Sequence, residues 1–591
     1  MKPIALFLVF LTCHDVLSSV SDQTSEVGLA DIEGVIAGYG DFNSDQATDV
    51  FVISKDWATV HVYLWNVRNQ KFTKGDATVK SENIVNIVPA DFNGDGDMDL
   101  LISTESSKKT VISQVYFGNR KSLTKSDDLK IEAKDQPTVF DMNGDYLPDL
   151  FGTDLNGNRT YWVYVPTENK NNAHFSTETQ ETGTDIAIPN SNGFVDATGD
   201  LHPDLVVKSI AAEDKGVVFE IWKQNKKDME LAGTLLMFED KNIEMVGQVS
   251  FADIDNDETM DLIVPICLKK DCEHSKIYSH SLSMLNGKFI TTWQLLLSNE
   301  NSDWKFDPET FTKGKIPFML NFGDFIMDGK IDAVAILQKK DDGTPFAVQL
   351  VNQPCSPASH KCNGARSFRI AEIKTKGYPT SVSLMDVYEN GALDFMVSYE
   401  IKTQKKTIKG MQVLRNDYNS DAAFLKVAVL SGDKTSAKYG SNLAGATVII
   451  QTTDTDDNAL VRKATQLSQT AYFSLSLPYV VFGLGRSPNF VEKITVGVCQ
   501  SDNPKIDRVR TWASIIPNSQ VIVIPTPKDS PSDWVTRLLV TPSKILLQTA
   551  GVLIGTCLLI AGLILILHIK EKKEDEREKR KEAHKFHFDA L

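Results

Sequence analysis

The residues of this chain best suited to chemistry form a short acidic motif, seen most fully at 91–99 as DFNGDGDMD. Carboxylate or carboxamide oxygens stand at its odd positions, in Asp91, Asn93, Asp95, Asp97 and Asp99. Like charges a few ångströms apart repel, so a folded loop of this composition needs a cation or full solvation. Calcium takes about six to eight oxygen ligands, and side chains at positions 1, 3, 5 and 9 with a carbonyl at position 7 supply several of them. The motif therefore predicts a calcium loop.

Two other structures compete with this interpretation. An EF-hand loop requires a bidentate Glu at position 12 and helices on both sides, whereas position 12 is apolar or Gly in the full copies of this motif and its flanks resemble strands. An Asx turn, in which Asp and Asn bond only to nearby backbone, remains an open alternative for every copy.

The motif recurs along the chain. Full copies occupy 41–49, 91–99, 141–149, 196–204 and 253–261, and weaker copies occupy 324–332 and 386–394; these are loops 1 to 7 in chain order. An apolar stretch precedes each loop, and a β-branched or aromatic run follows it. A repeat of about 58 residues with three or four short strands is typical of one propeller blade. We expect an all-β ectodomain with a seven-bladed β-propeller over residues 28–418.

The candidate calcium ligands lie in loops 1 to 5. They are Asp41, Asn43, Asp45 and Asp49; Asp91, Asn93, Asp95, Asp97 (through its carbonyl) and Asp99; Asp141, Asn143, Asp145 and Asp149; Asp196, Thr198, Asp200 and Asp204; and Asp253, Asp255, Asp257 and Asp261. Position 3 is Ile326 in loop 6 and Tyr388 in loop 7, so calcium should bind there weakly or not at all. The predicted cofactor is structural Ca²⁺ at up to five sites, with Kd on the order of 10⁻⁴–10⁻³ M.

Both ends of the chain carry apolar segments. Residues 1–20 resemble a secretory signal peptide, with one basic residue before a short apolar run. Residues 545–569 are long enough to cross a bilayer as a helix, and eight Lys or Arg residues follow within 570–591. The positive-inside rule then predicts a type I single-pass protein with an extracellular propeller and a cytoplasmic tail. A net charge of −16 argues against nucleic acid as a partner.

The cysteines fit an oxidising compartment. Cys267 and Cys272 form one close pair and Cys355 and Cys362 another, so each pair is a candidate for a small disulfide loop. With Cys13 in the signal peptide and Cys557 in the span set aside, Cys499 is left over and is predicted to be a buried free thiol, with intermolecular pairing as the alternative. The sequon at Asn158 predicts a glycosylated, exposed loop.

Residues 419–527 lack the acidic loop and contain strand-like runs, for example FLKVAVL and ATVIIQT, which predict a compact β-sandwich. Its GATV, FGLG and VEKITV segments resemble the small sandwich of cartilage acidic protein-like molecules. Residues 528–544 contain Pro and Ser and are interpreted as a stalk before the span.

The acidic loop resembles the FG-GAP repeat of integrin α-chain propellers, although the chain is about half their size and lacks a GFFKR-type tail and the Gly-Ala-Pro triplet. With its signal peptide, seven repeats, further small domain, one span and short charged tail, the chain is similar to the T-cell immunomodulatory protein/Linkin family. The resemblance implies adhesion between cells and modulation of T-cell function.

Three functions compete. The first is a cell-surface adhesion or receptor protein at the plasma membrane, which binds an extracellular protein through the propeller and a cytosolic partner through its tail. The second is a shed ectodomain that acts as a soluble immunomodulatory ligand. The third, an extracellular hydrolase, has the least support, because GxSxG, HExxH and P-loop motifs are missing and the histidines are scattered. We expect no enzymatic activity.

Overall fold

The computed structural model describes residues 20–588 except 168–172, 181, 212–215, 226–227, 238–242, 286, 291, 312–315, 357–361, 405, 419–421, 433–438, 454–457, 487–489 and 541–543. The predicted signal peptide lies outside the described residues apart from Val20. The chain divides into two compact units near residue 540.

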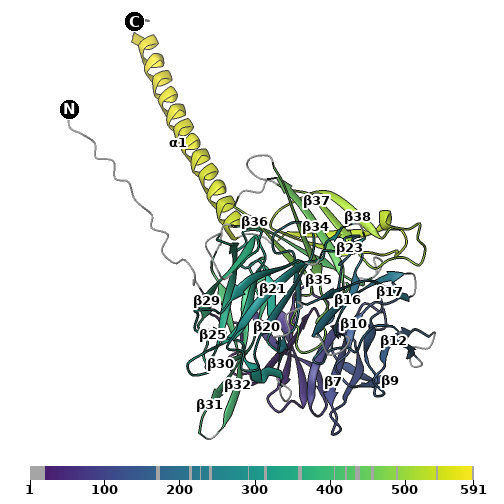
Figure 1. Ribbon diagram of the computed structural model, residues 1–591. Coiled ribbons are helices and arrows are strands. Elements are labelled where there is room, and N and C mark those ends of the chain that lie inside the picture. Colours follow the sequence, from purple (N-terminus) through teal and green to yellow (C-terminus); the bar gives the residue numbers. More distant parts are fainter. Residues whose placement is uncertain are drawn as a thin grey trace. The chain divides into compact units, whose positions relative to one another are not determined.

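In the described part of the chain, seven antiparallel sheets form the blades of a propeller (Figure 1). Blade 1 contains β2 (Gly34–Gly40), β3 (Asp49–Ser54), β4 (Thr59–Asn66) and β5 (Lys71–Lys80). Blade 2 contains β6 (Ile84–Ala90), β7 (Asp99–Glu105), β8 (Val111–Gly118) and β9 (Leu123–Ala133). Blade 3 contains β10 (Thr138–Phe140), β11 (Asp149–Thr153), β12 (Arg159–Val165) and β13 (His174–Thr179). Blade 4 contains β14 (Gly193–Val195), β15 (Asp204–Ile210), β16 (Val217–Asn225) and β17 (Asp228–Leu236). The seven-bladed prediction is thus confirmed.

In blades 5 and 6 the first strand is interrupted and consists of two short segments. Blade 5 contains β18 (Met245–Val246), β19 (Ser250–Ala252), β20 (Asp261–Cys267), β21 (Ser275–Ser281) and β24 (Trp293–Ser298), with a small hairpin of β22 (Met284–Leu285) and β23 (Lys288–Phe289). Blade 6 contains β25 (Trp304–Lys305), β26 (Leu320–Gly323), β27 (Asp332–Lys339), β28 (Pro345–Pro354) and β29 (Arg366–Ile373), and the short 3₁₀ helix Pro308–Phe311 lies between β25 and β26.

Blade 7 closes the ring with a strand from the start of the chain. It contains β30 (Tyr378–Met385), β31 (Asp394–Lys402) and β32 (Thr407–Asn416), and β1 (Val20–Asp22) pairs antiparallel with β32. The predicted propeller range of 28–418 left out this strand, so within the described residues the propeller extends back to Val20. The strand was missed because its three residues are paired across almost 400 positions of sequence and carry little local signal.

Adjacent blades share cores, and position 2 of the acidic loops contributes to them. Phe92 of loop 2 is fully buried with Val139, Leu150 and Trp162 of blade 3. Phe42, Met142 and Ile254 occupy the equivalent places in loops 1, 3 and 5. Burying a side chain of this size stabilises the fold by roughly 1.5–3 kcal/mol. Each loop is therefore anchored to the neighbouring blade as well as to its own.

The second domain is a sandwich of two four-stranded sheets in the described residues. One sheet orders β36 (Val480–Gly485), β33 (Ala423–Val429), β39 (Ser519–Ile524) and β40 (Val535–Val540); the other orders β35 (Ala459–Gln466), β34 (Ala446–Thr453), β37 (Val491–Gly497) and β38 (Val509–Ile515). Valines, leucines and isoleucines of both sheets form one buried core.

The sandwich extends beyond its predicted end at residue 527. Strand β40 completes one sheet, the 3₁₀ helix Pro531–Asp533 precedes it, and Trp534 is buried in the sandwich core. Residues 528–540 of the predicted stalk are therefore part of the folded domain. The Pro and Ser residues that suggested a linker form a turn, and the following strand has only six residues, which made it hard to distinguish from a stalk.

A segment of the second domain fills the propeller axis. Residues 467–479, here called the plug, connect β35 to β36. Gln469 pairs with Tyr39 of β2, accepting the backbone N–H at 2.8 Å and donating to the carbonyl at 2.7 Å. Asn86 of β6 donates to the Thr470 carbonyl at 3.0 Å, and Gln248 of blade 5 donates to the Ala471 carbonyl at 3.0 Å. The plug thus interlocks the two domains along the channel.

The second unit is the helix α1 (Lys544–Phe588). Its Thr549–Glu582 part is the one helix among the described residues that is long and apolar enough to cross a membrane. The helix α1 contains the whole predicted span, residues 545–569, and continues into the predicted tail.

Candidate metal centre in the propeller loops

The seven acidic loops occupy the same place in every blade. Each loop begins after the first strand of its blade, and the Asp at position 9 is the first residue of the second strand. This Asp pairs with the last residue of the first strand in every blade. The pairs are Gly40 with Asp49, Ala90 with Asp99, Phe140 with Asp149, Val195 with Asp204, Ala252 with Asp261, Gly323 with Asp332 and Met385 with Asp394. Because this register is constant, all seven loops lie at one face of the propeller. This face is called the loop face below.

The backbone of the loops is also constant. Positions 4 and 6 have positive φ in all seven copies, with values of 66° and 79° at Gly94 and Gly96 of loop 2. Loop 1 adopts the same conformation with Ser44 and Gln46, at 58° and 73°. Glycine occupies such positions without steric cost, whereas other residues are strained there. From the sequence, only Gly96 at position 6 of loop 2 was recognised as a residue that permits this turn. The shared conformation was not recognised, because loops 1 and 5 have no glycine at either position.

Position 1 closes each loop. Its carboxylate accepts the backbone N–H groups of positions 5 and 6 in all seven copies; in loop 2, Asp91 accepts them from Asp95 at 3.1 Å and Gly96 at 3.0 Å. These are the bonds of the Asx-turn alternative. A carboxylate oxygen that accepts one N–H keeps another lone pair, so the same geometry leaves ligand capacity for a cation.

Position 9 braces the blade. In loop 2, Asp99 accepts the Phe92 N–H at 2.9 Å and, through its other oxygen, the Gly118 N–H of the third strand at 2.8 Å. Loops 6 and 7 keep this contact to the third strand, through Asp332 with Asn352 and Asp394 with Asn416. The sequence suggested only a ligand role for position 9. The brace explains why Asp persists in the two loops that have lost position 3.

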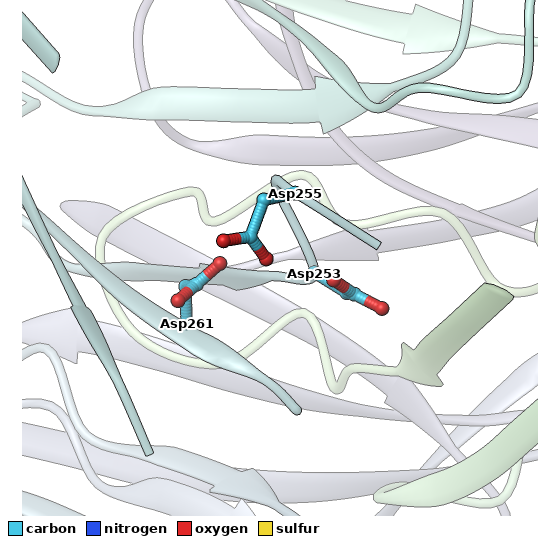
Figure 2. A group of neighbouring side chains, drawn as sticks. All are labelled: Asp253, Asp255 and Asp261. Carbon is cyan, nitrogen blue, oxygen red and sulfur yellow. The ribbon is translucent and has the colours of Figure 1, made fainter. Parts of the chain in front are cut away.

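Loop 5 brings its carboxylates closest together. One oxygen from each of Asp253, Asp255 and Asp261 lies within 4.8 Å of the other two (Figure 2). Ligands at about 2.3–2.6 Å from one calcium ion lie at most about 5 Å apart, so these oxygens fit a single ion. Asp257, the fourth predicted ligand, accepts the Thr259 N–H at 2.8 Å and is outside this cluster.

Burial makes the loop carboxylates costly to ionise. Desolvation raises the pKa of Asp41 and Asp253 to about 7, with nearby carboxylates adding to the effect. Desolvation likewise raises the pKa of Asp91 and Asp141 to about 6. A bound cation would offset this cost, because an opposite charge favours the ionised form. The donor set of loops 1, 2, 3 and 5 thus fits calcium.

Loops 4 and 7 each contact a lysine from the second domain. Lys463 of β35 places its Nζ 2.7 Å from Oδ2 of Asp196, with both side chains buried. Lys426 of β33 lies 3.3 Å from Oδ2 of Asp386 and also bonds to Glu389. Sequence reasoning missed both lysines. The available signal was Lys426 inside the apolar run FLKVAVL, since a lysine in a buried strand needs a partner.

Other loops contact the second domain as well. Ser431 donates to Asp91 of loop 2 at 3.0 Å, Arg508 donates to the Gly144 carbonyl of loop 3 at 2.6 Å, and the Gly483 N–H donates to Asp324 of loop 6 at 3.1 Å. His202 of loop 4 lies 2.6 Å from the Val498 carbonyl through Nδ1. The loop face is therefore the docking surface of the second domain.

Both predicted disulfides form, between Cys267 and Cys272 and between Cys355 and Cys362. Cys499 is a buried thiol that is not disulfide-bonded within the described residues, as predicted. It packs beside loop 3, and burial raises its pKa well above the usual range. Asn158 is exposed in the turn between β11 and β12, where its glycosylation stays a prediction.

The comparisons with known proteins agree with this architecture. Residues 41–102 match the FG-GAP-like repeat family, and residues 438–539 match the family described as "ITFG1, C2 domain". These findings define an FG-GAP β-propeller protein with a C2-like second domain. The "T-cell immunomodulatory protein" of Homo sapiens is 34% identical over 97% of this chain and 95% of its own length. This chain belongs to the T-cell immunomodulatory protein family.

More distant relatives align over nearly the whole chain. "Protein linkin" of Caenorhabditis elegans is 27% identical, over 95% of this chain and 96% of its own. A "T-cell immunomodulatory protein homolog" of Plasmodium falciparum (isolate 3D7) is 28% identical, over 93% and 87%. Among solved structures, an endo-arabinase from Bacteroides thetaiotaomicron VPI-5482 covers 47% of this chain and 92% of its own, with 11% identity and a TM-score of 0.25, which is too low to support an inference.

Proposed function

We propose that this protein is a cell-surface adhesion or receptor-type protein whose calcium-stabilised propeller binds an extracellular protein through the face opposite the loop face. The observation that carries the proposal is the docking of the second domain. Because the loop face is covered by the sandwich and the channel is filled by the plug, the opposite face is the propeller surface left for a partner.

The opposite face carries a pocket of about 650 Å³. The turns between the second and third strands of blades 1 and 6 and the facing ends of those strands in blade 7 contribute to it, and Phe473 and Leu475 at the tip of the plug line it. Trp57 lines it beside Lys409, whose Nζ lies 4.8 Å from the indole ring. Pockets of this size with aromatic walls and a few polar groups are typical binding sites. We infer that the partner inserts apolar side chains here.

We propose that calcium has a structural role and takes no part in partner binding. The residues that would hold it are the odd-position side chains of loops 1, 2, 3 and 5. A bound ion would neutralise the buried carboxylates and fix the loops on which the second domain rests. Calcium thus favours one rigid arrangement of the ectodomain, while the chemistry of partner recognition stays on the other face.

The membrane arrangement follows from α1. We propose that the helix anchors the chain in the plasma membrane with the propeller outside, and that the charged end of the helix meets a cytosolic partner. The family name supports modulation of T cells. Shedding at a stalk receives less support, because residues 528–540 belong to the sandwich and proteases prefer exposed, poorly bonded chain.

The test is cell–cell aggregation with the full chain displayed on a cell line that otherwise does not aggregate. Trp57→Ala and, separately, Lys409→Glu should lower aggregation at equal surface display. Phe490→Ala, an exposed apolar position on the second domain, is the matched control and should have no effect. Normal aggregation by both pocket variants would contradict the proposed face.

A further inference from the structure

We propose that Lys463 and Lys426 are the resident cations of loops 4 and 7, so that the second domain supplies by ion pairing what calcium supplies in loops 1, 2, 3 and 5. Calcium is then excluded from loop 4, although the sequence of that loop predicts a calcium site. The calcium count in this inference rests on the proposed function, whereas the lysine pairing stands without it.

Loop 4 has the side chains of a calcium site. Asp196, Thr198, Asp200 and Asp204 stand at positions 1, 3, 5 and 9. The Lys463 ammonium, however, lies 2.7 Å from Asp196 Oδ2, with exposed fractions of 2% for the lysine and 0% for the aspartate side chain. A second amine, from Lys223, lies 2.5 Å from Asp200 Oδ2. The Lys223 side chain is 40% exposed, whereas Lys463 is buried, so Lys463 is the ammonium group that occupies a buried carboxylate a calcium ion would need.

Loop 7 has lost its position-3 ligand but keeps buried acids. Asp386 at position 1 is fully buried, and Glu389 at position 4 bonds to the Lys426 ammonium. The Tyr479 ring lies 3.9 Å from the same ammonium and adds a cation–π contact. The lysine side chain is only 2% exposed. A fixed ammonium thus compensates buried carboxylates where too few ligands remain for a metal.

The two lysines come from different strands of the sandwich, β35 and β33, and reach blades 4 and 7. Buried charges are tolerated when they are paired, and removing one partner leaves the other uncompensated. The two ion pairs therefore specify how the sandwich sits on the ring. On the loop face, calcium and lysine both compensate the charge of buried carboxylates. The lysines differ because they are part of the chain and cannot dissociate.

The experiment measures bound calcium per chain by equilibrium dialysis of the purified full-length protein in detergent against radiolabelled calcium. Asp95→Ala in loop 2 should lower the count by one ion, whereas Asp200→Ala in loop 4 should leave it unchanged. Lys463→Met should raise the count by one, and Lys463→Met with Asp200→Ala should return it to the original value.

Two results would overturn the inference. If Asp200→Ala alone lowers the count, calcium sits in loop 4 in spite of Lys463. If Lys463→Met leaves the count unchanged, the ammonium is not what excludes calcium.

A second measurement does not depend on calcium binding anywhere. Acylation of lysines by an activated ester, followed by mass spectrometry, should label Lys463 and Lys426 on the order of 100-fold more slowly than Lys406, which has an exposed side chain. Asp196→Asn should speed labelling of Lys463 and leave Lys426 protected. Rapid labelling of both lysines in the unmodified chain would refute the pairing, even if the proposed calcium sites also fail.

Discussion

The ammonium nitrogen of Lys463 lies 2.7 Å from a carboxylate oxygen of Asp196, although 267 residues separate them and they belong to different domains. The contact joins a strand of the sandwich to an acidic loop of the propeller. It shows that the loops have two tasks: they turn the chain between strands, and they receive the second domain.

Removing this lysine should destabilise the protein. Lys463→Met leaves Asp196 buried without its cation, and breaking a buried pair costs about 3–5 kcal/mol. Urea unfolding in the presence of a chelator measures the loss. Lys55→Met is the control, because the Lys55–Glu33 pair is on the surface, where ion pairs contribute little to stability.

The double variant Lys463→Met with Asp196→Asn separates charge from packing. It should recover part of the stability that Lys463→Met loses, because the buried charge is gone. A double variant less stable than Lys463→Met alone would argue that the lysine contributes through packing only.

The plug should stabilise the interlock of the two domains. Gln469→Ala removes both bonds to the Tyr39 backbone and leaves a buried N–H and a buried carbonyl unsatisfied, at roughly 1–3 kcal/mol for each group. Hydrogen exchange at the Tyr39 amide should accelerate. Gln404→Ala, at an exposed position, serves as the control. An unchanged exchange rate at Tyr39 would show that the plug does not restrain β2.

The brace at position 9 should act without metal. Asp332→Ala in loop 6 removes the acceptor of the buried Asn352 N–H, so the free energy of unfolding should fall by about 1–3 kcal/mol. The loss should be the same in calcium and in chelator. Asp341→Ala, in an exposed turn, should change stability little. A loss at Asp332 that appears only with calcium would instead make loop 6 a metal site.

The buried Lys208, which lies outside the acidic loops, should make the free energy of unfolding depend on pH. Burial lowers the pKa of Lys208 to about 8, against about 10.4 in the unfolded chain. Between these values the unfolded state binds more protons, so stability rises with pH over that window. The shift corresponds to at most about 3 kcal/mol. Lys208→Met should gain stability below pH 8 and flatten the rise; parallel curves for both proteins would contradict the assignment.

The sequence predicted features that local pattern encodes. The spacing of Asp91 to Asp99 located a strand–loop–strand unit, and its repetition gave the number of blades. The close spacing of Cys267 and Cys272 gave a disulfide. Each of these features depends on residues within one short segment, where turn chemistry and strand periodicity are visible.

Features that depend on distant partners were missed. Strand β1 pairs with β32, Gln469 reaches Tyr39, and Lys426 reaches Asp386, in each case by contacts that no local pattern describes. The end of the sandwich was also placed too early, because Trp534 shows its role only when packed against the core. The acidic loops were thus predictable from sequence, whereas the lysine that pairs with loop 4 was not.

The most direct test of the central claim, a propeller stabilised by calcium in loops 1, 2, 3 and 5, is thermal unfolding of the full-length chain across a calcium titration. At about 2 mM calcium, each site with Kd on the order of 10⁻⁴–10⁻³ M should add roughly 0.6–1.8 kcal/mol. The melting temperature should rise by several degrees from chelator to calcium, and Asp91→Ala with Asp95→Ala should remove only part of the rise. A melting temperature that does not respond to calcium would contradict the account.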